Sequence, residues 1–252
     1  MTVASRQKIS LIFPMAGQGA RFGYRFKPFL EVCGKPFIEA AFAPFRPWLS
    51  EIDKVYFIFT EEQDRAHDVS GRLSRIFADV RHECAVLPAP TDGPAETLRQ
   101  CLEMKAIAGP ILVCDCDHAV DVDDLMRTAQ DPEVACAVPT WDLAGENHAA
   151  WGIAAIAANG WIDAIAEKKL PERGASFRGV IGCYYFADAG RVRRFIVETR
   201  KPYLSDVIAT YLENGEPVRS VAVHEAQFFG DPARLAQVSG DPVEAFGTRR
   251  YV

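Results

Sequence analysis

The stretch ISLIFPMAGQGARFGYRFKPFLEVCGKPF, residues 9–37, decides the fold of this chain. It begins with a short apolar run, residues 9–13, which ends at Pro14 and Gly17 and therefore predicts a buried strand that enters a loop. A loop in this position lies at the carboxyl end of a parallel sheet, which is the edge where open α/β folds bind their ligands. The stretch thus predicts an α/β protein with a ligand-binding loop directly after its first strand.

Strands and helices alternate through the rest of the first half. Apolar runs predict strands over 54–59, 84–87, 110–115 and 134–139, and helical spacing predicts helices over 36–46, 61–77, 94–106 and 120–130. Such alternation is typical of βαβ units. We therefore expect a Rossmann-like three-layer sandwich with a mixed, mostly parallel sheet.

The second half is richer in strands. Residues 151–168 predict two strands joined at Asn159-Gly160, a strong hairpin signal, and residues 178–188 predict another. Helices over 189–200 and 204–213, a strand over 218–223 and a short helix over 231–237 follow. Because no linker, repeat or low-complexity segment interrupts the pattern, we expect a single domain over 1–252, with a first part at about 8–140 and a strand-rich part at about 150–238.

Composition narrows the class of protein. With 49% hydrophobic and 25% charged residues, the 252-residue chain can bury a sizeable core, and its net charge of −6 disfavours a general nucleic-acid binder. No apolar run approaches the roughly 18 residues of a membrane span, and the N-terminus lacks the pattern of a signal peptide. Seven cysteines without a CxxC pair disfavour a disulfide framework and a structural zinc site. We expect a cytoplasmic protein.

The glycine-rich loop suits a phosphate ligand. Gly17 and Gly19 let backbone N–H groups approach anionic oxygens, Arg21 can donate two parallel hydrogen bonds to a phosphate, and Lys27 adds a compact charge. The loop lacks the GxxxxGK[ST] pattern of a P-loop and the third glycine of the dinucleotide fingerprint. Both of those nucleotide-binding classes are therefore excluded.

An acidic cluster follows the strand over 110–115. Asp115 and Asp117 come at the same predicted sheet edge as Gly17, and their hard oxygens suit Mg²⁺, which also bridges nucleotide phosphates. Either one can face the ligand, because alternate residues of a strand share a face. Three further acids, Asp121, Asp123 and Asp124, are better explained as residues at a helix N-terminus. A softer metal on Cys114, Cys116 and His118 is disfavoured, since three such ligands within five residues of a strand end do not converge.

These segments together resemble the sugar-phosphate nucleotidyltransferases. That family shows G-x-G-[TS]-R-[LF], then K-P-[FL]-L, then G-K-P, which correspond here to Gly17-Gln18-Gly19-Ala20-Arg21-Phe22, Lys27-Pro28-Phe29-Leu30 and Gly34-Lys35-Pro36. The resemblance implies a GT-A-like nucleotidyltransferase fold and Mg²⁺ as cofactor. It implies condensation of an NTP with a phosphorylated acceptor, for which a sugar 1-phosphate is the leading candidate. The products would be pyrophosphate and an NDP-sugar-type compound of the kind used in polysaccharide biosynthesis. Ala20 departs from the pattern, because Thr or Ser is usual there.

The resemblance also implies roles for particular residues. Arg21 and Lys27 would be catalytic. The triphosphate would be bound by the loop of Ala16, Gly17, Gln18, Gly19 and Ala20, and the nucleobase would be read by the helix start at Gly93, Pro94 and Ala95. The acceptor would be bound by Gly152, Glu167, Lys168 and Gly182. The metal would be bound by Asp115 or Asp117, with Asp231 as the candidate second ligand because Phe228 stands where that aspartate is often found. Asp231 could equally cap the following helix.

Three alternatives remain open from the sequence. Asp115-Cys116-Asp117 has the Asp-x-Asp form of GT-A glycosyltransferases, which use nucleotide sugars. A cytidylyltransferase with a phosphocholine-like acceptor would have the same first motif. Ala20 and Phe228 would suit a non-catalytic nucleotide-binding regulator. The expected partners are an NTP and a small phosphorylated acceptor, with no nucleic acid and no membrane, and a homo-oligomer is left open.

Overall fold

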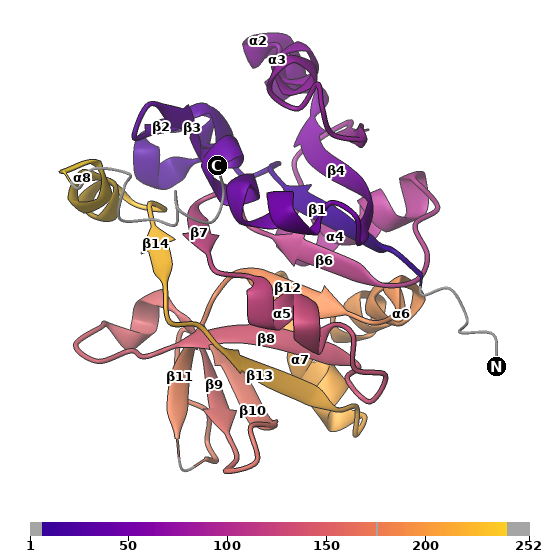
Figure 1. The fold of residues 1–252 in the computed structure, drawn as a ribbon, viewed down its shortest axis with the longest axis vertical. Helices are drawn as coiled ribbons and strands as arrows, with labels where there is room; N and C mark the ends of the chain where they lie inside the picture. The colour runs from indigo at the N-terminus through magenta and orange to yellow at the C-terminus, as the bar shows by residue number, and fades with distance from the viewer. Residues whose placement is uncertain (1–6, 175, 241–252) are drawn as a thin grey trace.

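A mixed β-sheet runs through the whole molecule (Figure 1). The structure is a computed structural model that describes residues 7–174 and 176–240. The strand order is β10-β9-β11-β8-β12-β6-β1-β4-β5, with β13 paired to β8. The strands of this sheet are β1 (Ile9–Pro14), β4 (Ile52–Thr60), β5 (His82–Leu87), β6 (Ile111–Cys114), β8 (Cys136–Trp141), β9 (Gly152–Ile156), β10 (Ile162–Glu167), β11 (Phe177–Val180), β12 (Cys183–Phe186) and β13 (Val218–Ala222).

The N-terminal half of the sheet is parallel. The first strand, β1, lies between β4 and β6 and pairs with both in parallel, and β5 extends the sheet beyond β4. Side chains of β1 are buried on both faces, as expected for a parallel strand covered by helices. The predicted α/β class, and the glycine-rich loop at a carboxyl sheet edge, are confirmed.

The other half pairs mainly antiparallel. Strands β9 and β10 form the hairpin predicted at Asn159-Gly160, where Gly160 has a φ of +82°. The single strand predicted over 178–188 is wrong, because it divides into β11, which pairs with β8 and β9, and β12, which pairs with β6 and β8. The chain changes neighbours at Ile181-Gly182, where the Gly182 carbonyl accepts a hydrogen bond of 2.7 Å from the Asp115 N–H.

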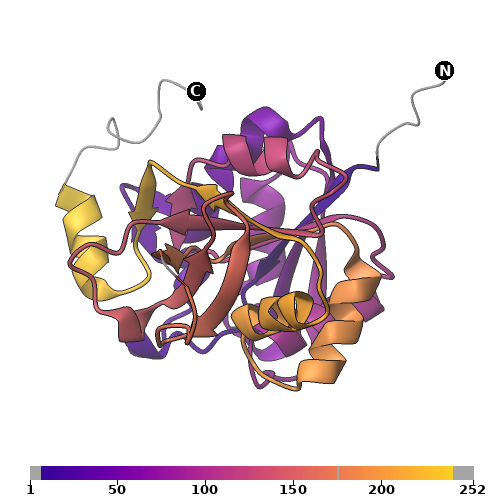
Figure 2. The same cartoon turned by 90° about the horizontal axis from the view of Figure 1, so that it is seen from below.

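Helices cover both faces of the sheet, which confirms the three-layer sandwich (Figure 2). On one face lie α1 (Phe37–Phe42), α3 (Val69–Ile76) and α5 (Asp123–Thr128), whose apolar residues join one core cluster. On the other lie α4 (Pro94–Met104), α6 (Ala189–Thr199) and α7 (Leu204–Glu213), which join a second cluster. The remaining helices are α2 (Glu61–His67), α8 (Pro232–Gly240) and the 3₁₀ helices η1 (Ala20–Phe22), η2 (Lys27–Phe29), η3 (Ala43–Trp48) and η4 (His148–Ala150).

Two predicted helices have different ends. The helix over 61–77 is two helices, α2 and α3, because Asp68 adopts the left-handed conformation with a φ of 49° and breaks the hydrogen-bond series. The helix over 36–46 ends at Phe42 and continues as η3, in which Pro44 and Pro47 are incompatible with a regular α-helix. Neither change affects the carboxyl edge of the parallel strands.

Two small sheets were not predicted. Strands β2 (Glu31–Val32) and β3 (Lys35–Pro36) form a short hairpin after the glycine-rich loop. Strands β7 (His118–Val120) and β14 (Ala226–Phe228) pair antiparallel and set His118 opposite Phe228. This pairing brings the C-terminal segment beside the acidic cluster. Within 7–174 and 176–240 we find no helix with the length and apolar character needed to span a membrane.

Candidate active site

The glycine-rich loop leaves its backbone open to a ligand. Gly19 has a φ of +66°, and a side chain there would collide with the Arg25 carbonyl, so only glycine fits. Gly17 and Gln18 are exposed, and a Cβ at Gly17 would meet no atom of the described part of the chain within 4 Å. The Gly17 carbonyl accepts a hydrogen bond of 3.1 Å from Gln63 Nε2, which anchors the loop to α2. The open side of this loop suits the approach of an anion.

Lys27 reaches from the loop to the acidic cluster. Its Nζ atom lies 2.8 Å from Asp117 Oδ2, and the two side chains are 29% and 21% exposed. Burial by itself lowers the pKa of Lys27, but Asp117 and its neighbours raise it above its ordinary value. Burial raises the pKa of Asp117, but the Lys27 charge and a hydrogen bond with His118 hold it well below its ordinary value. The pair is therefore fully ionised at neutral pH.

Asp115 lies beside this pair and is a weaker acid than Asp117. Burial, followed by the charge of Asp117, raises the pKa of Asp115 to about 6. Its carboxylate rests against Gly182, where any Cβ would collide with it. Gly230 faces Asp117 in the same way, with a Cβ position 2.5 Å from Asp117 Oδ2. Both carboxylates thus occupy space that two glycines leave open.

A cavity of about 190 Å³ brings most of the predicted residues together. Those that line it are Arg21, Asp115, Asp117, Gly152, Glu167, Gly182 and Asp231. They come from the glycine-rich loop, the ends of β6, β9 and β10, the β11–β12 connection and the start of α8. The cavity therefore lies between the parallel half of the sheet and the strand-rich half.

The other predicted residues, Lys27 among them, do not line this cavity. Ala16, Gly17 and Gln18 line a second cavity of about 430 Å³ together with Thr60, His67 and Pro90. Gly19 and Ala20 line neither cavity. Lys168 points to Tyr203, whose hydroxyl lies 2.9 Å from Lys168 Nζ.

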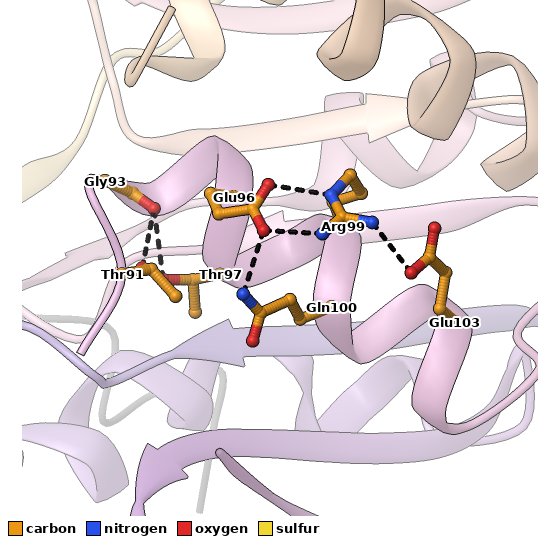
Figure 3. Close-up of polar contacts among 7 residues, drawn as sticks. All are labelled: Thr91, Gly93, Glu96, Thr97, Arg99, Gln100 and Glu103. Atoms are coloured by element: carbon orange, nitrogen blue, oxygen red, sulfur yellow. Dashed lines mark hydrogen bonds and ion pairs between the residues drawn. The ribbon is translucent and has the colours of Figure 1, made fainter. Parts of the chain in front are cut away.

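The helix start at Gly93, Pro94 and Ala95 lies apart from the first cavity. Figure 3 shows Thr91 and Thr97 around the Gly93 carbonyl, each with Oγ1 3.1 Å from that oxygen. The turn that begins α4 is thereby held by two side chains.

An aromatic wall with one arginine completes the cavity, and the sequence analysis did not assign these residues. Trp151 and Phe228 line it with ring centroids 4.9 Å apart, and the Arg234 guanidinium lies 4.9 Å and 5.6 Å from their centroids. Arg234 forms an ion pair of 2.5 Å with Glu146, which lies 88 residues earlier. No local sequence signal relates residues so far apart.

Asp231 serves the start of α8. Its Oδ1 atom accepts hydrogen bonds of 3.0 Å from the N–H groups of Ala233 and Arg234, and its Oδ2 atom lies 3.3 Å from Arg234 Nε. Within 7–174 and 176–240, no group of three or more His, Cys, Asp or Glu side chains is arranged to hold a metal ion. Mg²⁺ needs fewer protein ligands than that, because it is usually held by one or two carboxylates together with substrate phosphates and water. Asp115 and Asp117 fit this pattern, and Asp117 is ionised.

The acids of the following helix lie outside the cavity. Asp121 Oδ1 accepts a hydrogen bond of 2.9 Å from the Asp123 N–H at the start of α5, and Asp124 forms an ion pair with Arg127. Their predicted place at a helix N-terminus is confirmed.

A family of known proteins matches most of this chain. Residues 12–182 match the model of the MobA-like NTP transferase domain, and the chain belongs to this family. It is therefore a nucleotidyltransferase, which disfavours the glycosyltransferase and regulator alternatives. No curated protein matches the chain.

Solved structures share the fold at low identity. A nucleoside-diphosphate-sugar pyrophosphorylase from Vibrio cholerae RC9 is 20% identical, with a TM-score of 0.77 over 92% of this chain and 100% of its own. A UDP-glucose pyrophosphorylase complexed with UDP-glucose is 16% identical, with a TM-score of 0.76 over 96% of this chain and 100% of its own. The expected GT-A-like nucleotidyltransferase fold is confirmed.

Proposed function

We propose that this nucleotidyltransferase joins an NTP to a sugar 1-phosphate and releases pyrophosphate. The observation that carries the proposal is the cavity itself, in which Arg21 from the glycine-rich loop lies with Asp117 and Glu167. A positive group for a triphosphate and carboxylates for sugar hydroxyls thus meet in one place. The part at about 8–140 would bind the nucleotide, and the part at about 150–238 would bind the acceptor.

The reaction needs no general base. An oxygen of the acceptor phosphate, already anionic, forms a bond to the α-phosphorus of the NTP, and the bond from that phosphorus to the β-phosphate oxygen breaks. Pyrophosphate leaves with the electron pair. Arg21 and Lys27 would neutralise the charge that develops on the phosphates, and the backbone of residues 16–20 would hold the triphosphate.

Asp115 and Asp117 would hold a Mg²⁺ ion, with Asp231 as a further candidate. The ion, when bound, would supply charge to the phosphates and orient the leaving pyrophosphate. Lys27 forms an ion pair with Asp117, so its ammonium would lie next to the phosphates that the ion contacts.

The cavity wall favours a sugar over a phosphocholine-like acceptor. Carboxylates accept hydrogen bonds from hydroxyl groups, and Glu167 presents its carboxylate opposite Gly152 across the β9–β10 pair. A quaternary ammonium would need aromatic faces, but the Arg234 guanidinium already lies over Trp151 and Phe228. Its positive charge would repel a cationic acceptor.

A pyrophosphate-release screen tests the proposal. Each of the common NTPs would be combined with hexose 1-phosphates and with phosphocholine, in the presence of MgCl₂. We expect pyrophosphate with at least one sugar 1-phosphate and none with phosphocholine. Release of an NDP from a nucleotide sugar instead would identify a glycosyltransferase and overturn the proposal. A role in polysaccharide biosynthesis, the cytoplasmic location and a homo-oligomer stay predictions.

A further inference from the structure

The connection between α6 and α7 contacts the helix start predicted to read the nucleobase. The Pro202 carbonyl accepts a hydrogen bond of 3.0 Å from the Ala95 N–H. Pro202 also lies so close to Gly93 that a Cβ there would be 2.6 Å from the Pro202 carbonyl oxygen. Thr91 and Thr97 both donate hydrogen bonds to the Gly93 carbonyl (Figure 3). The turn that contacts Pro202 is therefore itself held by side-chain hydrogen bonds.

Tyr203, the next residue of the connection, and Ser205, in the first turn of α7, contact the predicted acceptor residues. Tyr203 accepts a hydrogen bond of 2.9 Å from Lys168 Nζ, which also lies 4.6 Å from the centroid of its ring. Ser205 Oγ, in a side chain only 2% exposed, donates a hydrogen bond of 2.7 Å to Glu167 Oε2. Pro202, Tyr203 and Ser205 therefore contact both halves of the predicted site.

These contacts leave Glu167 and Lys168 with hydrogen-bonding capacity for the acceptor. Ser205 occupies one oxygen of Glu167, so the other can accept a hydrogen bond from an acceptor hydroxyl. Lys168 has three ammonium hydrogens, of which Tyr203 receives one.

The outer side of the connection is open. A cavity of about 620 Å³ lies there, lined by Arg200, Lys201 and Pro202 and by the loop of residues 90–92. On the inner side, Pro202, Tyr203 and Ser205 contact Gly93, Ala95, Lys168 and Glu167, and Leu204 is buried in the second core cluster.

We propose that residues 202–205 couple the nucleotide and acceptor halves of the site, and that Tyr203 and Ser205 are the positioning residues that hold Lys168 and Glu167 for the acceptor. The inference rests on the proposed function. A nucleotide that orders the turn at Gly93–Ala95 would also order Pro202, and with it the anchors of Lys168 and Glu167. By reciprocity, a bound acceptor would strengthen nucleotide binding by the same factor.

The test compares substitutions that each remove a single hydroxyl group from a residue in α7 or directly before it. Tyr203→Phe and Ser205→Ala should each raise the acceptor KM on the order of 10-fold while kcat changes less, and should reduce the gain in acceptor affinity that a non-hydrolysable NTP analogue produces. Tyr211→Phe is the control, because the buried Tyr211 hydroxyl on α7 has no hydrogen-bond partner among the described residues. It should leave the acceptor KM and the affinity gain unchanged.

A double-mutant cycle separates positioning from a general structural role. In a Lys168→Ala background, Tyr203→Phe should have no further effect on the acceptor KM, because the group it positions is gone. Additive effects of the two changes, or a Tyr203→Phe enzyme that matches Tyr211→Phe, would overturn the inference while leaving the proposed function intact. A wild-type enzyme that releases no pyrophosphate with any pair would instead overturn the proposed function, and this inference with it.

Discussion

Lys27 Nζ and Asp117 Oδ2 lie 2.8 Å apart although 90 residues separate them in the chain. The pair joins the glycine-rich loop to the acidic turn after β6. It places a cation predicted to act on the NTP next to a carboxylate predicted to bind the metal. The two groups hold each other ionised, so both charges are in place before a substrate arrives.

Lys27→Ala should lower turnover by about 100-fold or more, since removal of one group that stabilises transition-state charge typically costs that much. The measurement is the rate of pyrophosphate release with the best substrate pair. Lys35→Ala is the matched control, because Lys35 belongs to the same segment but is 58% exposed and pairs only loosely with Glu39 at 3.8 Å. Equal rates for the two variants would contradict the role of Lys27.

Chelation of divalent cations with EDTA should abolish turnover, and added Mg²⁺ should restore it. Asp117→Asn should raise the midpoint of the Mg²⁺ titration by at least about 10-fold, because even second-shell partners of a metal are worth that much. Asp115→Asn should have the smaller effect, since the pKa of Asp115 is about 6 and Asp117 is the more acidic of the two. The opposite ranking would make Asp115 the principal metal ligand.

Asp115→Asn should also change how stability depends on pH in the absence of metal. The folded-state pKa of about 6 is above the ordinary value of 3.8, so the folded state favours the protonated carboxyl and the wild type loses stability as the pH rises between these values. The variant should therefore be more stable than the wild type by about 3 kcal/mol at pH 8 in EDTA, with a smaller difference in stability at pH 4.5.

Urea denaturation at the two pH values measures this difference. Asp124→Asn serves as the control, because the Asp124 side chain is 64% exposed and lies outside the cavity. A stability gain for Asp115→Asn that is the same at pH 4.5 and pH 8 would show that its charge is not the cause.

Arg234→Ala should raise the acceptor KM by about 10-fold, because it removes the ion-pair partner of the partly buried Glu146 carboxylate and one side chain of the cavity wall. Nucleotide affinity, measured by calorimetry without acceptor, should stay within a factor of about two. Arg219→Ala provides the comparison, since Arg219 also lies over a tryptophan, Trp161, but away from the cavity. If phosphocholine became a substrate of Arg234→Ala, the guanidinium would be confirmed as the group that excludes cationic acceptors.

Local patterns predicted several of the elements that surround the candidate site. The buried strand β1, the loop at Gly17 and Gly19, and the hairpin at Asn159-Gly160 depend on interactions within a few residues, which a sequence displays directly. Glu167 and Gly152 also lie in the cavity as expected, because pairing in that hairpin sets them opposite each other.

The chain order of apolar runs, glycines and charges by itself determined the α/β class, the carboxyl edge that carries the site, and the residue types available there. Only the tertiary structure decided which of these groups meet. The β7–β14 pair, the Arg234–Glu146 ion pair and the contacts of Tyr203 and Ser205 with Lys168 and Glu167 join segments that are distant in the chain. The physical reason is that local conformational preferences act over a few residues, whereas these contacts depend on how the completed sheet and its helices bring separate segments together.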